Sequence, residues 1–98
     1  MKTEDDVLVE LQALLAEAIS FGTGIPFERI RSMTSFFSSL EDFYDVPMRL
    51  RVFSGASGKQ IDLLTNEERD LVEAFRQRVA ASKSPISECF EIACRANA

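Results

Sequence analysis

The stretch FSGASGKQ, from Phe53 to Gln60, contains the residue types of a phosphate-binding loop, in which backbone amides wrap around phosphate oxygens. That loop follows the pattern G-x-x-x-x-G-K-[ST], where the last residue holds magnesium. Here only two residues separate Gly55 from Gly58, and Gln60 follows Lys59. The spacing therefore favours a bend made of Gly and Ser over a nucleotide site.

Carboxylates gather in EDFYD, where Glu41 and Asp45 fall on one helical face beside Asp42, and again in NEERD further along the chain. Such groups could bind a metal ion or act as a catalytic pair. Two carboxylates on a regular helix are more often a solvated surface, and the chain has no histidine to act as a further ligand or general base. We therefore expect no metal, no cofactor and no catalytic residue, and hence a protein that is not an enzyme.

Basic residues are concentrated in the centre of the chain, where Arg29, Arg31, Arg49 and Arg51 lie together with Lys59. If the four arginines converge, they form a basic face that could meet a phosphate-bearing or acidic partner. The net charge of −5 opposes binding to a nucleic-acid duplex, and the aromatic-basic interleaving typical of single-strand binding is missing. Scattered solvated arginines are the simpler interpretation, and nucleic-acid binding is disfavoured.

Aromatic residues are also concentrated in the centre of the chain, which has eight phenylalanines in all. One short segment holds Phe36, Phe37, Phe43 and Tyr44. Phe36 and Phe37 are adjacent and cannot point the same way on a helix. Together with Tyr44 they can present more aromatic surface than one small core buries, and exposed aromatic patches commonly mark interfaces. These four residues are either core or a surface for a protein partner or for a second copy of the chain.

The elements that position these residues begin with a helix predicted over residues 3–20. Thr3 and Asp6 have the spacing of a capping box, Gly22 and Gly24 can close the helix, and Pro26 can open a short helical segment in IPFERI. One apolar face follows the helical period and consists of Val7, Leu8, Leu11, Leu14, Leu15, Ala18 and Ile19.

The central segment predicts a helix over about residues 33–45, with Ser38 and Glu41 as an internal capping box where the helix could instead begin. Pro47 should end or kink that helix, because proline cannot donate a backbone hydrogen bond and restricts the residue before it.

Two alternatives exist beyond the proline. MRLRVF, from Met48 to Phe53, alternates apolar and basic residues like a strand and could form a β-hairpin over residues 48–64. The other alternative is a short helix closed by Gly55, with Asp45 and Arg49 spaced for an ion pair. We favour the helix slightly.

Two further helices are predicted in the C-terminal part. Thr65 and Glu68 form a capping box for a helix that ends near Ala81, and Ser84 and Pro85 can start the last helix. The expected inner faces are Leu71, Val72, Phe75 and Val79 on the first helix, and Ile86, Cys89, Phe90 and Ala93 on the second. Cys89 and Cys94 are turned about 140° apart on that last helix, so we expect two reduced thiols.

Composition places the chain among soluble globular domains, with 46% apolar and 28% charged residues. No apolar run approaches the length of a membrane span, and the start MKTEDD is acidic where a secretory signal is positive. We therefore expect one all-α domain over residues 1–98, a compact bundle of four or five helices, in the cytoplasm and away from membranes.

Several segments together resemble acyl and peptidyl carrier domains, which are four-helix proteins that carry a phosphopantetheine arm on a serine. The segments are EDDVLVELQALLAEA, IPFERI, TSF, SSLEDFYDVPMRLRVF and DLVEAF. The resemblance implies modification of Ser39, which Leu40 follows. It departs from the family's Gly-x-Asp-Ser-Leu signature, which here lacks both the glycine and the aspartate, with Ser38 in place of the aspartate.

These observations predict a small acidic protein-protein interaction module of the regulator, inhibitor, immunity or adaptor type, acting through the central aromatic surface. The alternatives are a degenerate carrier-like protein modified on Ser39 and a weak nucleic-acid-binding module that uses the central arginines. No small-molecule substrate is evident.

Overall fold

The computed structural model describes residues 2–54 and 64–97. Over these residues the chain is helical and contains no strand, which confirms the all-α prediction. The elements in order are α1 (Glu4–Thr23), α2 (Phe27–Arg31), the 3₁₀ segments η1 (Thr34–Phe36) and η2 (Leu40–Asp45), α3 (Val46–Phe53), α4 (Asn66–Ala80) and α5 (Pro85–Ala96).

Helix α1 begins as its sequence predicts, but it continues to Thr23, three residues beyond the predicted end. The Thr3 hydroxyl accepts a hydrogen bond from the Asp6 N–H at 3.2 Å, and the Asp6 carboxylate accepts one from the Thr3 N–H. Gly24 has a φ of 82°, a left-handed conformation in which glycine is favoured, and its N–H donates to the Ser20 carbonyl. Gly22 lies inside the helix, and a β-carbon there would stand 2.6 Å from the Phe75 ring. The glycine therefore lets α4 approach the backbone of α1.

The helix expected over residues 33–45 is wrong, because η1 and η2 are separate 3₁₀ segments joined by extended backbone. The capping box joins Ser39 and Asp42 in place of Ser38 and Glu41. The helical segment before Pro47 does end there, since η2 stops at Asp45, and Pro47 stands in the first turn of α3, where a missing N–H costs nothing.

Residues 48–53 belong to α3, so the favoured helix is confirmed for this stretch and the first strand of the alternative hairpin is wrong. Asp45 caps α3 by accepting a hydrogen bond from the Met48 N–H at 3.3 Å. The expected ion pair between Asp45 and Arg49 does not form, because Arg49 pairs with Asp42. The predicted glycine-rich bend and the second hairpin strand lie outside the described residues.

The last two helices also start where the sequence predicts. Thr65 and Glu68 form the capping box of α4, and Ser84 is the N-cap of α5 with Pro85 in its first turn. Leu71 and Phe90 were expected to be buried, but both are exposed. The inner faces are narrower than predicted and consist of Val72, Phe75 and Val79 on α4, and of Cys89, Ile92 and Ala93 on α5.

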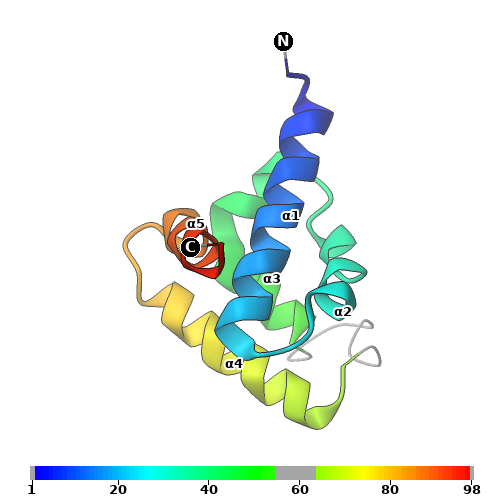
Figure 1. Cartoon of the computed structure of the whole chain (residues 1–98). Coiled ribbons are helices and arrows are strands. Elements are labelled where there is room, and N and C mark those ends of the chain that lie inside the picture. Colours follow the sequence, from blue (N-terminus) through cyan, green and yellow to red (C-terminus); the bar gives the residue numbers. More distant parts are fainter. Residues whose placement is uncertain (1, 55–63, 98) are drawn as a thin grey trace.

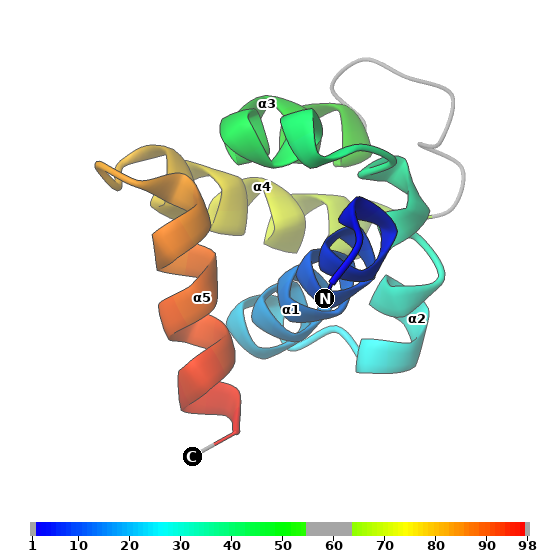
Figure 2. The same ribbon diagram turned by 90° about the horizontal axis from the view of Figure 1, so that it is seen from above.

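The helices surround one core in which α1 is the central element. Helix α1 packs mainly against α5 and α2, and α3 packs against α4. Figure 1 shows α1 running down the front of the molecule from the N-terminus, and Figure 2 shows α5 and α2 on either side of it, with α3 and α4 along a third side at the top of the view. The largest fully buried side chains include Leu15, Ile19, Ile30, Phe37, Leu50, Val72 and Ile92. Among the described residues, none of the helices combines the length and apolar character that crossing a bilayer requires.

Candidate interaction surface

The four aromatic residues predicted as core or interface are divided by the structure. Phe37 is 1% exposed and Phe43 is 3% exposed, and their ring centroids lie 5.1 Å apart inside the core. Phe36 is half-buried, with the Arg49 guanidinium 5.6 Å from the centre of its ring. Tyr44 is 84% exposed. Phe37 and Phe43 are therefore unavailable to a partner in this fold, while Tyr44 is accessible.

The geometry of η2 explains why neighbouring residues differ so strongly in burial. A 3₁₀ helix has three residues per turn, so each residue is rotated by about 120° from the one before it. Phe43 consequently points into the core while Tyr44 points to solvent. In an α-helix the rotation between neighbours is smaller, about 100°, so a prediction based on the α-helical period underestimates how far the two side chains diverge.

Tyr44 stands at a surface hollow between η2 and the first turns of α1, which we call the acidic hollow. Its volume is about 460 Å³. The apolar part is formed by Leu8, Leu40 and the Tyr44 ring, and Ser38 and Ser39 contribute hydroxyl groups. Three carboxylates complete the lining, those of Glu4, Asp5 and Glu41.

These three carboxylates leave the acidic hollow negatively charged. Within residues 2–54 and 64–97, none of Glu4, Asp5 and Glu41 takes part in an ion pair or a side-chain hydrogen bond. The N-terminus of α1 adds only about half a positive charge, which three carboxylates exceed. In the same part of the chain, no group of three or more His, Cys, Asp or Glu side chains is arranged to hold a metal ion. The hollow therefore favours a cationic group supplied by another molecule.

Asp42 holds the turn on which this surface is built. Its Oδ2 atom accepts hydrogen bonds from the Ser38 N–H at 2.9 Å and from the Ser39 N–H at 3.1 Å, and its Oδ1 atom pairs with Arg49. Burial by itself would raise the pKa of Asp42, but the N–H groups of Ser39 and Ser38 and the charge of Arg49 together lower it below its usual value. Asp42 is therefore ionised at neutral pH and orients the residues that lead into η2.

Ser39, the position implied by the resemblance to carrier domains, is exposed at the N-cap of η2 and lines the acidic hollow. Its backbone is held by Asp42, so its place at the start of a helical segment is well defined.

The four central arginines lie on two different helices, and two of them are engaged by carboxylates. Arg29 on α2 pairs with Glu68 on α4, and this hydrogen bond lowers the pKa of Glu68 to about 2. Arg49 on α3 pairs with the buried Asp42. Arg31 on α2 and Arg51 on α3 are exposed. Two of the four arginines predicted for a basic face therefore have their charge offset by a neighbouring carboxylate.

The start of α1 belongs to this surface, although its sequence does not predict such a role. Glu4 and Asp5 have the pattern of a helix N-terminus and Leu8 that of a core residue. No local signal in the sequence places them beside Tyr44, because that contact joins residues about forty positions apart.

Comparison with protein-family models, with curated proteins and with solved structures finds no match to this chain.

Proposed function

We propose that this chain is a small acidic, non-enzymatic protein-protein interaction module that binds a basic segment of another protein in the acidic hollow. The observation that carries the proposal is the exposed Tyr44 ring beside three carboxylates that have no partner among the described residues. Charge complementarity identifies the partner chemistry as lysine- or arginine-rich.

The surface offers such a segment two kinds of contact. An arginine or lysine side chain can lie against the Tyr44 ring and Leu8, while its charged end reaches Glu4, Asp5 or Glu41. A cation on an aromatic face contributes about 0.5–2 kcal/mol, and each exposed ion pair contributes about 0.2–1 kcal/mol. The expected complex is therefore weak and sensitive to salt, as regulatory contacts of small modules often are.

A basic peptide is the probe that tests this proposal. We expect a synthetic 12-residue peptide of alternating arginine and leucine to shift the amide resonances around Tyr44 and Leu8 in an NMR titration. Tyr44→Ala should weaken binding about tenfold or more, because central aromatic residues dominate small interfaces. Met48→Ala is the matched control, since Met48 is exposed on the next helical turn but does not line the hollow. Equal affinity of wild type and Tyr44→Ala, or binding that ignores salt, would contradict the proposal.

A second candidate function is a carrier-like protein modified on Ser39, and the exposure of Ser39 at the N-cap of η2 favours it. After co-expression with a phosphopantetheinyl transferase, this candidate predicts one added phosphopantetheine in the intact mass and none in Ser39→Ala. An unchanged wild-type mass would eliminate it. The nucleic-acid alternative loses its main support, because Arg29 and Arg49 already pair with carboxylates.

A further inference from the structure

Two side chains of the acidic hollow, those of Glu41 and Tyr44, stand on the same side of η2. They are three residues apart, and side chains at positions i and i+3 of a 3₁₀ helix are eclipsed. Both line the hollow, and most of the Tyr44 ring is exposed to solvent. A single group of a partner can therefore lie over the ring and reach the carboxylate at the same time.

The protein holds one of its own arginines with this combination of groups. The guanidinium carbon of Arg49 lies 5.6 Å from the centre of the Phe36 ring, and the same guanidinium pairs with the Asp42 carboxylate. A guanidinium can make both contacts because it is planar, so that its flat face meets a ring while the N–H groups at its edge donate to a carboxylate. Arg49 thus shows, in the neighbouring part of the chain, which cation suits an aromatic ring beside a carboxylate.

A lysine side chain satisfies these two requirements less well. Its ammonium group is a compact charge that is more strongly hydrated than a guanidinium, so contact with a ring removes more tightly held water. The three carboxylates of the acidic hollow attract either cation to the same extent at long range, since each cation carries one charge. Discrimination between the two cations therefore has to come from short-range contacts, and the Tyr44 ring is the group in the hollow that can make them.

We infer that the acidic hollow selects arginine over lysine and that Tyr44 is the residue that determines this specificity. The inference rests on the proposed function, because it concerns which basic residue the same hollow accepts. In the complex, a guanidinium of the partner lies on the Tyr44 ring and donates to Glu41, while the two carboxylates of α1 attract the remaining positive charge of the segment. The partner is then an arginine-rich segment.

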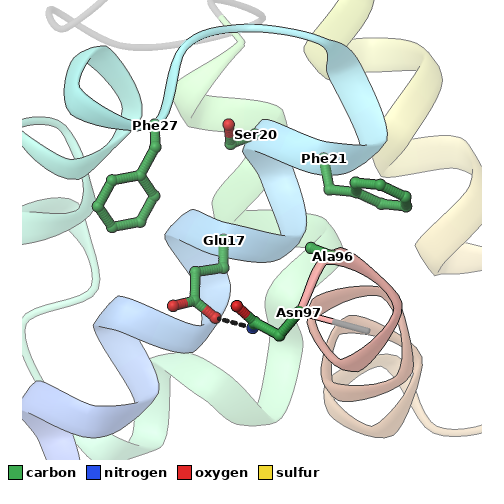
Figure 3. A pocket seen from close by; sticks show the side chains of 6 residues that line it. All are labelled: Glu17, Ser20, Phe21, Phe27, Ala96 and Asn97. Atoms are coloured by element: carbon green, nitrogen blue, oxygen red, sulfur yellow. Dashed lines mark hydrogen bonds between the residues drawn. The ribbon is translucent and has the colours of Figure 1, made fainter.

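A hollow near the other end of α1 also combines aromatic rings with a carboxylate, but it arranges them differently. It has a volume of about 320 Å³ and is lined by Glu17, Phe21 and Phe27 together with the end of α5. Figure 3 shows Phe21 and Phe27 on opposite sides of α1, and the Glu17 carboxylate accepts a hydrogen bond from the Asn97 side chain at 2.9 Å. Its one carboxylate attracts a basic segment less than the three of the acidic hollow, so this second hollow provides a control for the variants below.

Two 12-residue peptides test the inference on the full 98-residue chain. One alternates arginine with leucine and the other alternates lysine with leucine, so both carry the same charge. We expect titrations at one salt concentration to give a dissociation constant about three- to fivefold lower for the arginine peptide, which is the size of a cation–ring contact at an exposed site. Tyr44→Leu keeps an apolar contact but removes the ring, so it should weaken binding of the arginine peptide to the level of the lysine peptide and change the affinity for the lysine peptide about twofold or less.

Phe21→Leu is the matched control, because it makes the same kind of change on another exposed ring that lies in a hollow with a carboxylate. This variant should keep the preference for arginine, and circular dichroism checks that both variants are folded. The inference is overturned if wild type binds the two peptides equally, if the preference persists in Tyr44→Leu, or if Phe21→Leu abolishes it. Equal binding of both peptides leaves the proposed function standing, whereas a wild-type protein that binds neither peptide overturns the proposed function and this inference together.

Discussion

Phe37→Ala is expected to lower the free energy of unfolding by about 3–5 kcal/mol, as large aromatic truncations in cores do. The Phe37 ring is almost completely buried, packs against Phe43 and meets the Phe36 ring edge-on with centroids 6.1 Å apart. Its backbone carbonyl also accepts a 2.6 Å hydrogen bond from the Gln12 side chain, so the segment is tied to α1. Chemical denaturation followed by circular dichroism measures the loss.

The matched control is Tyr44→Ala, which removes a larger aromatic side chain from the same short segment. Because Tyr44 is exposed, its replacement should change the free energy of unfolding by only about 0.5 kcal/mol or less. Since domains of this kind are stable by about 5–15 kcal/mol, Phe37→Leu provides a milder variant if Phe37→Ala does not fold. A fully stable Phe37→Ala variant that turns a dimer into a monomer would instead place Phe37 at a self-interface.

The parts of the fold that the sequence predicted are those decided within a few residues. The capping boxes at Thr3 and Thr65, the proline start of α5 and the glycine end of α1 depend on side chains that reach only their own first or last turn. These signals are local, and they determine the starts of α1, α4 and α5 and the end of α1. They contain no information about which helix faces which.

The wrong helix over residues 33–45 and the wrong placement of its aromatic residues have one physical cause, a change of helix type within the segment. A periodicity of 3.6 residues assigns Phe36, Phe37, Phe43 and Tyr44 to one continuous helix, whereas the backbone changes to 3₁₀ turns and extended residues between them. Two kinds of interaction select this path: the burial of Phe37 and Phe43, which is tertiary, and the bonds from Ser38 and Ser39 to Asp42, which are local. The acidic hollow could not be predicted for the same reason, because it requires the start of α1 to lie beside η2.

The acidic hollow follows from how this small bundle distributes its charge. With a net charge of −5 the surface as a whole disfavours acidic partners, and Glu4, Asp5 and Glu41 concentrate negative charge at one site.

Asp42→Asn is the second change with a large expected effect, a decrease of about 2 kcal/mol in the free energy of unfolding at pH 7. The substitution keeps the size of the side chain but removes the charge that pairs with Arg49 and that strengthens the bonds from Ser38 and Ser39. Glu41→Gln is the matched control, because it removes a neighbouring exposed carboxylate that has no side-chain bond among the described residues. It should leave the stability within about 0.5 kcal/mol of wild type.

The pH dependence of the Asp42 effect follows from the direction of its pKa shift. The pKa of Asp42 is lower in the folded protein than its ordinary value of 3.8, so the carboxylate contributes stability above that value and loses the contribution as the pH falls through the folded pKa. The difference between wild type and Asp42→Asn should therefore be constant from about pH 7 to 5 and decrease below pH 4. Glu68, whose pKa of about 2 follows from its bond to Arg29, loses its own contribution in the same acid range, but it does so equally in both proteins and cancels in the comparison. A difference that stays the same down to pH 2 would mean that the Asp42 charge does not hold the turn, and that the position of Tyr44 depends on packing alone.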